Sequence, residues 1–151
     1  MPIDGYRLFR YALLGEATLN LASVVPMFLE PEYILTWLFE SSEDITPGAC
    51  ALTQWCGCII AGLTLPLLLS FPDGKDAPVI RRNTYTTYAT VELAIGALVT
   101  FQYYKGGSGL RSDALYTSMT TMAALVAVRA YFLFGNPEYM GEQTTEEKKS
   151  Q

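Results

Sequence analysis

Four long apolar stretches constrain the fold of this chain more than any other feature. Each is close to the ~20 residues that a helix needs to cross the hydrocarbon core of a bilayer. Hydrophobic residues make up 50% of the 151 residues and charged residues only 17%, less than the roughly one quarter that is usual in soluble domains. We therefore predict an all-α integral membrane protein, an antiparallel four-helix bundle within residues 1–137. The predicted spans cover residues 8–28, 49–71, 84–104 and 114–134.

The basic residues predict the orientation of the bundle, because Lys and Arg are enriched on the cytosolic side of membrane proteins. Arg7 and Arg10 precede the first span, and few basic residues fall in the loops 29–48 and 105–113. We therefore expect both termini to be cytosolic and these loops to be lumenal, in a multi-pass protein of the endoplasmic reticulum. The other cytosolic basic residues are Lys75, Arg81, Arg82, Arg129, Lys148 and Lys149, and the lumenal ones are Lys105 and Arg111.

A cleaved signal peptide is the alternative interpretation of the first span. Two arginines precede an apolar run that ends near the small residues Ala22 and Ser23, as in a secretory signal. Glu16 and Asn20 interrupt what should then be a purely apolar core. We therefore favour a retained membrane helix.

Two segments outside the spans have distinct compositions. Residues 31–39 are too short to cross a bilayer but mix aromatic with aliphatic side chains, which is typical of a segment lying at the level of the lipid headgroups. Residues 138–151 are rich in Glu, Lys, Thr and Gln. We expect this polar tail to be disordered and cytosolic.

Glu16 and Glu92 stand near the middle of the first and third apolar stretches. A carboxylate in hydrocarbon is costly, and it usually marks a functional site. Both spans run from the cytosolic to the lumenal side, and each acid is eight residues past the start of its span. At 1.5 Å per residue, each lies roughly 12 Å inside the membrane. The two carboxyl groups should therefore share one layer of the bundle.

Other polar side chains are placed to reach the same layer. Arg129 lies near the cytosolic end of the fourth span, and its long side chain can extend to the carboxyl groups. Asn20 follows Glu16 by one helical turn and Tyr88 precedes Glu92 by one turn, so each acid has a candidate hydrogen-bond partner. We predict Asn20, Tyr88 and Arg129 as positioning residues, together with Gln54, which enters from the lumenal end of the second span. Most other tyrosines are expected in the interfacial belts, namely Tyr85, Tyr103, Tyr104, Tyr131 and Tyr139.

The predicted carboxyl pair favours acid–base chemistry. Two carboxyl groups that meet in a low-dielectric bundle should not both stay ionised, which leaves a protonated acid beside a carboxylate. One group can then give a proton to the oxygen of an opening epoxide while the other takes a proton from the attacking water or hydroxyl. The alternative is structural: Glu16 and Glu92 bond across helices to Arg129, Tyr88 or Asn20 and only hold the bundle together.

Residue types that are rare or missing exclude several other chemistries. The chain has no histidine, and its cysteines, Cys50, Cys56 and Cys58, lie at the start of or inside the second span. A Cys-x-Cys spacing on a helix puts the thiols on different faces, so packing is favoured over a metal site or a disulfide. We expect no metal, no cofactor and no Ser–His or Cys–His nucleophile. Nothing in the charge pattern suggests nucleic-acid binding.

Short motifs recur along the spans, namely the opening Tyr6-Arg7-Leu8-Phe9, Glu16, Leu52-Thr53-Gln54, Glu92 and the closing Arg129-Ala130-Tyr131-Phe132. They resemble those of small fungal four-span membrane proteins encoded with polyketide synthase pathways. The family includes the epoxide hydrolases or cyclases of aurovertin, citreoviridin and asteltoxin type pathways. The similarity covers about residues 6 to 140. A second fungal four-span family, the anthrone oxygenases, is similar in size, but the lack of histidine does not support an oxygenase.

The resemblance implies a substrate and a set of roles. The substrate would be a polyene epoxide dissolved in the lipid bilayer, with ring closure following ring opening. Glu16 and Glu92 would be the acid and base, in an order left open, and Asn20, Tyr88 and Arg129 would orient them. The alternative function is a non-catalytic lipid-binding or scaffolding membrane protein of a biosynthetic pathway. Self-association and contacts with pathway enzymes stay open as partners.

Overall fold

The computed structural model describes residues 5–141 and is all-helical over that range, as predicted. Among these residues, the only β-type pairing is a single bridge between Phe39 and Leu110. The long helices are α1 (Gly5–Leu29), α3 (Pro47–Ser70), α4 (Ala77–Lys105) and α5 (Ser112–Ala130). The short ones are α2 (Pro31–Leu38), η1 (Ser42–Asp44), η2 (Tyr131–Gly135) and η3 (Pro137–Met140).

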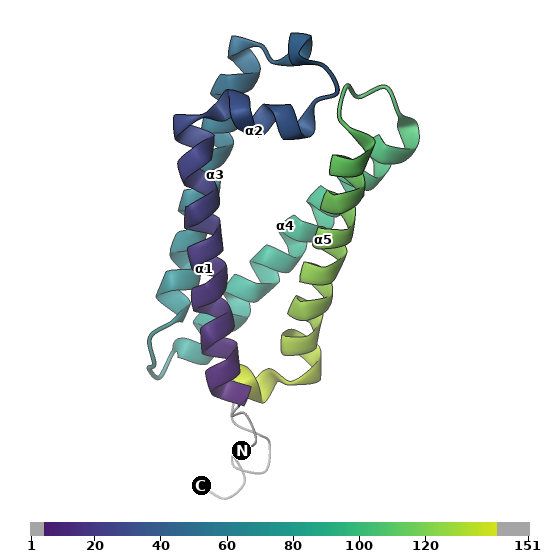
Figure 1. The fold of residues 1–151 in the computed structure, drawn as a ribbon. Coiled ribbons are helices and arrows are strands. Elements are labelled where there is room, and N and C mark those ends of the chain that lie inside the picture. The colour runs from purple at the N-terminus through teal and green to yellow at the C-terminus, as the bar shows by residue number, and fades with distance from the viewer. Residues whose placement is uncertain (1–4, 142–151) are drawn as a thin grey trace, which may run out of the picture.

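The long helices form two antiparallel pairs, α1 with α3 and α4 with α5 (Figure 1). The pairs lie close together at the end where α1 begins and α5 ends, and they separate toward the other end. Helix α2 lies across the separated end, where the Phe39–Leu110 bridge joins the two pairs. The amide of Glu40 donates to the carbonyl of Gly109 (3.0 Å), and that of Arg111 donates to the carbonyl of Leu38 (2.8 Å). The molecule therefore has a closed end and a wide end.

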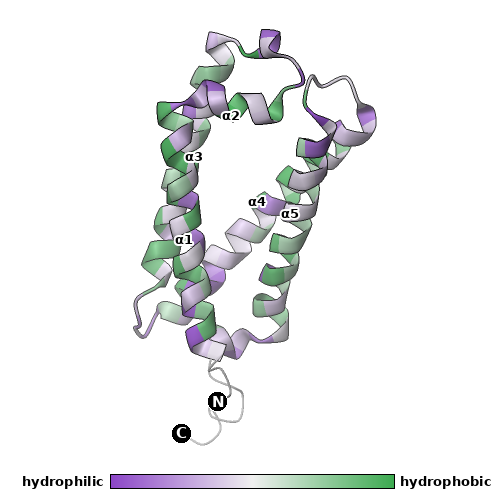
Figure 2. Cartoon of the chain, in the orientation of Figure 1, coloured by the Kyte–Doolittle hydropathy of each residue, from purple (hydrophilic) through white to green (hydrophobic). Residues whose placement is uncertain are grey.

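Three of the described helical segments are long and apolar enough to cross a membrane: α1, α3 and the continuous segment Ser112–Gly135. Their large apolar side chains point outward, as Leu19, Leu29 and Phe134 illustrate. The predicted span 84–104 lies within α4, which is long enough but carries more polar residues (Figure 2). The structure thus confirms a helical protein with three candidate membrane spans, whereas a fourth span stays a prediction.

A compact core fills the closed end. The ring of Phe9 packs against those of Tyr85 and Phe132, with centroids 4.9 and 5.0 Å apart. Such tilted and edge-on aromatic pairs are favourable beyond the area they bury. This cluster fixes the base from which the two helix pairs separate. Its other buried members are Leu13, Ala17, Leu67, Tyr88, Leu133 and Met140.

A buried arginine closes the C-terminal end of α3. Arg81 is fully buried, and its guanidinium donates to the carbonyls of Ser70, Phe71 and Pro72 and to the Asp73 carboxylate. The last carbonyls of a helix lack partners within the helix, and a basic side chain placed there satisfies them. From the sequence Arg81 is a cytosolic loop residue, but in the structure it belongs to the first turns of α4 and points inward.

The segment after α5 returns to the core. Residues 138–141 belong to the predicted polar tail, yet η3 packs beside α1 and Met140 is fully buried. The carbonyl of Met140 accepts a hydrogen bond from Arg81 (3.2 Å). A single apolar residue and one main-chain acceptor therefore anchor a segment whose composition is polar. The rest of the predicted tail, 142–151, lies outside the described residues.

Replacing Arg81 tests this closure. In Arg81→Met, the buried carbonyls of Ser70 and Met140 lose their donor at once, and each unsatisfied group costs about 1–3 kcal/mol. We expect the free energy of unfolding to fall by at least about 3 kcal/mol, measured by thermal unfolding in a mild detergent. The matched control is Arg82→Met, because Arg82 is the exposed neighbour. Equal losses in the two variants would contradict the role of Arg81.

Asp73 makes the stability of the Arg81 contacts depend on pH. Hydrogen bonds from Tyr6 and then Arg81 hold the pKa of the Asp73 carboxyl below its ordinary 3.8. A lowered pKa in the folded state adds stability that is fully present above the unfolded value and is lost as the pH falls through the folded value. We expect the melting temperature of the wild type to fall more steeply below about pH 3.8 than that of Asp73→Asn. Parallel melting curves would contradict this linkage.

Candidate active site

One arginine joins Glu16 and Glu92. The guanidinium of Arg129 on α5 donates from Nη1 to Glu16 Oε2 (2.7 Å) and from Nη2 to Glu16 Oε1. It also donates from Nη2 to Glu92 Oε1 (2.9 Å) and from Nε to Glu92 Oε2 (3.4 Å). Each of the four carboxylate oxygens therefore receives one hydrogen bond from the same side chain. The exposed fractions of the side chains are 2% for Arg129, 9% for Glu92 and 20% for Glu16.

Helical periodicity explains how these residues meet. On α4, Arg81, Tyr85, Tyr88 and Glu92 are spaced by four, three and four residues, and all are buried. This spacing places them on one face of the helix. On α1, Glu16 follows the buried Leu13 by three residues. The polar stripe of α4 is therefore turned toward the protein interior and away from its surroundings.

Two tyrosines flank the guanidinium of Arg129. Its Cζ lies 4.4 Å from the ring centroid of Tyr85 and 5.0 Å from that of Tyr88, within the range of a cation–π interaction. The hydroxyl of Tyr88 donates to the carbonyl of Leu63 on α3. This layer consequently connects all four long helices, since Arg129 joins α1, α4 and α5 and Tyr88 extends the contacts to α3.

A mostly apolar cavity lies against the carboxyl groups. Its volume is about 410 Å³, and side chains from all four long helices line it. Glu16, Glu92 and Tyr88 are among the lining residues, whereas Arg129 is not. The acids therefore face the cavity and the arginine lies behind them. The remaining lining residues are Leu19, Asn20, Ser23, Ile60, Leu63, Thr87, Val91, Ile95, Thr121, Met122 and Leu125.

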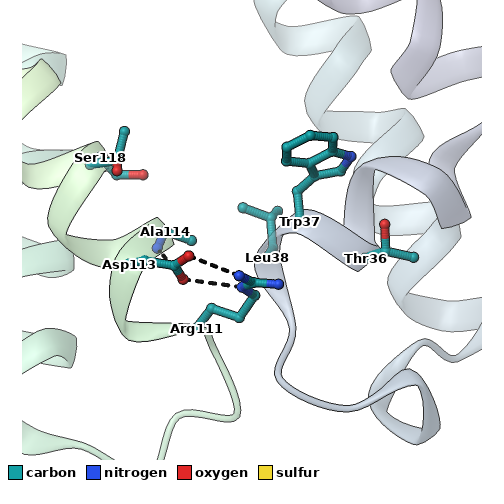
Figure 3. Close-up of a pocket in the computed structure, with 8 residues that line it drawn as sticks. Thr36, Trp37, Leu38, Arg111, Asp113, Ala114 and Ser118 are labelled. Atoms are coloured by element: carbon teal, nitrogen blue, oxygen red, sulfur yellow. Dashed lines mark hydrogen bonds and ion pairs between the residues drawn. The ribbon is translucent and has the colours of Figure 1, made fainter.

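A second hollow, of about 660 Å³, lies at the wide end between α2 and the start of α5 (Figure 3). Its charged groups are Arg111 and Asp113, which form an ion pair (2.8 Å) and are both largely exposed. Asp113 also accepts a hydrogen bond from the amide of Ala114 (3.0 Å), as an acid in the first turn of a helix commonly does. The ion pair and the helix-start contact explain why Arg111 and Asp113 occur here. None of the predicted site residues lines this hollow.

The structure brings some predicted site residues together and separates others. Glu16, Glu92 and Arg129 are in direct contact. Tyr88 was predicted to bond to Glu92, and it lies adjacent to the triad, but its hydroxyl donates to the carbonyl of Leu63 instead. Asn20 lines the cavity, and among the described residues its side chain has no hydrogen bond to Glu16. Helical spacing defines which residues are neighbours but not which acceptor is better aligned.

Gln54 lies apart from the triad and the cavity. Its Nε2 donates to the carbonyl of Phe28 (3.1 Å) near the C-terminal end of α1, and it does not line the cavity. That carbonyl is one of the last in its helix and lacks a partner within it. In the structure this contact ties α3 to α1, and the substrate-positioning role of Gln54 stays a prediction.

Tyr85 is the site residue that sequence analysis missed. We predicted an interfacial belt position, but its side chain is only 1% exposed and packs on Arg129. The available signal was its spacing, because Tyr85 lies three residues before Tyr88 and seven before Glu92. That pattern places the three residues on one helical face.

The described residues contain no group of three or more His, Cys, Asp or Glu side chains that could hold a metal ion. No protein-family model, curated protein or solved structure matches the chain. The fold and site define a helical protein with three candidate membrane spans and a buried Glu–Arg–Glu triad beside a mostly apolar cavity. The resemblance to the fungal epoxide hydrolases or cyclases stays a prediction.

Removing the arginine tests the triad. Arg129→Met leaves two buried carboxyl groups without their counter-charge, and breaking a buried ion pair in this way typically costs about 3–5 kcal/mol. We expect a matching fall in the free energy of unfolding in detergent. Adding Glu16→Gln and Glu92→Gln should recover part of it, because no uncompensated charge then remains. Arg111→Met is the control, since Arg111 is exposed. A fully stable Arg129→Met protein would contradict the triad.

Proposed function

We propose that this chain is a membrane-embedded acid–base enzyme that opens or cyclises an epoxide on a lipophilic polyketide, without a cofactor. The observation that carries the proposal is the position of two carboxyl groups, held by one guanidinium, on the wall of a mostly apolar cavity. Ring opening needs both a proton donor and a proton acceptor next to the substrate. An apolar cavity suits a substrate that partitions into lipid.

The proposal includes a fourth membrane span formed by α4. Its 29 residues extend roughly 43 Å at 1.5 Å per residue, enough to cross a bilayer. The polar side chains of Arg81, Thr84 and Glu92 are buried in the protein, whereas Leu98 and Phe101 are exposed. Low average hydropathy is therefore compatible with an apolar outer face. The four long helices would then form an antiparallel bundle in the endoplasmic reticulum membrane, with the closed end and both termini on the cytosolic side.

Charge balance supports one shared proton. An arginine and two ionised acids would carry a net charge of −1 in a low-dielectric region, where unbalanced charge is expensive. With one acid protonated, the triad is neutral and contains both a proton donor and a proton acceptor. Arg129 lies behind the acids and is not a lining residue, so it can hold them in place without blocking the cavity.

Protons and bonds balance over one catalytic turnover. The protonated acid gives its proton to the epoxide oxygen as the ring C–O bond breaks, and the carboxylate takes a proton from the attacking oxygen as the new C–O bond forms. Water as the nucleophile yields a diol, and a hydroxyl of the substrate yields a cyclic ether. The triad has lost one proton and gained one, so its charge is unchanged, and a proton exchange between the two acids restores the starting state.

A non-catalytic role is the second candidate, and one observation favours it. Arg129 already donates to every oxygen of both carboxylates, as expected of a purely structural link between helices. In that case the cavity would hold lipid, and the protein would act as a lipid-binding or scaffolding subunit of a biosynthetic pathway.

Amide substitutions separate the two functions. Glu16→Gln and Glu92→Gln keep the shape of each side chain but remove its acid–base chemistry. We expect each to lower turnover about 10²–10⁴-fold with normal expression. The assay follows a panel of lipophilic mono- and diepoxides of polyunsaturated esters in microsomes. Glu32→Gln is the control, because Glu32 is an exposed acid on α2. Unchanged product formation in either site variant would favour the lipid-binding alternative.

A further inference from the structure

We infer that Asn20 holds the attacking oxygen beside Glu16, which makes Glu16 the base and Glu92 the acid. This inference rests on the proposed function and resolves the order of roles that the sequence leaves open. It depends on three observations: the side-chain amide of Asn20, which has no hydrogen-bond partner within residues 5–141, the lack of a comparable group one turn from Glu92 on α4, and the unequal contacts of Arg129.

The first observation concerns Asn20. It lies four residues after Glu16 on α1, and both side chains line the cavity. One helical turn separates them by about 6 Å along the axis. An oxygen atom placed between them can therefore make a hydrogen bond of about 2.8 Å to each.

The amide of Asn20 makes no hydrogen bond to any other side chain or main-chain group in residues 5–141, although the Asn20 carbonyl accepts one from Ser23 Oγ (2.7 Å). Polar side chains between helices in a membrane normally find partners. An amide that faces a cavity without one is available to a ligand. Because an amide both donates and accepts, it can bind water or a substrate hydroxyl.

The second observation is that Glu92 has no equivalent neighbour on α4. One turn after it stands Gly96, and three residues after it stands Ile95. One turn before it stands Tyr88, whose hydroxyl already donates to the carbonyl of Leu63. Along its own helix, therefore, Glu92 lacks a free polar group to position a nucleophile, whereas Glu16 has one.

The third observation is the asymmetry of Arg129. Its Nη1 lies 2.7 Å from Glu16 Oε2, whereas its contacts to Glu92 are 2.9 and 3.4 Å long. Charge-assisted hydrogen bonds between ionised groups are the shorter ones, so Glu16 is the better candidate for the carboxylate. Glu16 is also the more exposed of the two acids. Both features suit a base that must reach a nucleophile in the cavity.

The assigned steps follow from this geometry. The nucleophile gives one proton to Glu16 as its oxygen bonds to the epoxide carbon, while Asn20 holds that oxygen in line. Glu92 gives its proton to the epoxide oxygen as the ring C–O bond breaks. Water donates its second hydrogen to the side-chain oxygen Oδ1 of Asn20, and a substrate hydroxyl accepts a hydrogen bond from the side-chain NH₂ group of Asn20.

Asn20→Leu tests the positioning of the nucleophile. We expect kcat to fall about tenfold or more, the effect of one well-placed hydrogen bond, with KM unchanged, on whichever panel epoxide the wild type opens. Thr18→Ala is the matched control, because Thr18 is a polar residue of the same helix that is exposed and does not line the cavity. Asn20→Ser is the second variant, and partial recovery of kcat with it would show that a polar group is required.

Azide tests the roles of the two acids. Azide attacks without losing a proton, so it bypasses the base but still needs the acid, and it forms an azido alcohol. In Glu16→Gln, Glu92 is the only remaining counter-charge of Arg129, so the assay is run over a range of falling pH. We expect azide to restore ring opening in Glu16→Gln increasingly as the pH falls, but not in Glu92→Gln at any pH. Restoration of Glu92→Gln, or of neither variant at any pH, overturns the assignment. Full kcat in Asn20→Leu overturns the role of Asn20 and leaves the proposed function intact, whereas a wild type that opens no panel epoxide removes both.

Discussion

The guanidinium of Arg129 is the contact on which the arrangement of the helices depends. It bonds to Glu16 and Glu92 on two other helices, and it lies against the rings of Tyr85 and Tyr88. The aromatic core keeps the helix pairs together at the end where α1 begins. Toward the other end the two pairs separate (Figure 1). The carboxyl groups therefore stand at the boundary between packed core and cavity. Without these contacts, each of the three charged side chains would be buried without an oppositely charged partner.

The inward polarity of α4 explains why this helix differs from the other long ones. Arg81, Thr84 and Glu92 lower its average hydropathy, yet all are buried against neighbouring helices. Each has a defined partner: Arg81 closes α3, Thr84 shares a hydrogen bond with Ser70 (2.9 Å), and Glu92 binds Arg129. Polar groups that are satisfied inside a protein do not need water. A helix of this kind can lie in lipid although its composition suggests otherwise.

Residue counting along the apolar stretches was enough to place Glu16 and Glu92 at one depth and Arg129 within reach. It could not fix rotation about the helix axes, which decides that Gln54 bonds to Phe28 and that Tyr88 bonds to Leu63. Tyr85 and Arg81 were misplaced for a related reason. Tyrosine and arginine are on average enriched at the membrane interface. Here specific partners hold the side chains of Tyr85 and Arg81 in the interior.

The structural and catalytic interpretations of the triad do not exclude one another. A link that only held helices would need neither a cavity beside it nor a side-chain amide without a partner among residues 5–141, and both occur next to Glu16. A site that only bound substrate would not need every carboxylate oxygen bonded to one guanidinium. An acid–base pair in lipid needs both properties, since fixed geometry keeps donor and acceptor in place and charge balance keeps the pair stable. The same four hydrogen bonds can therefore serve stability and chemistry.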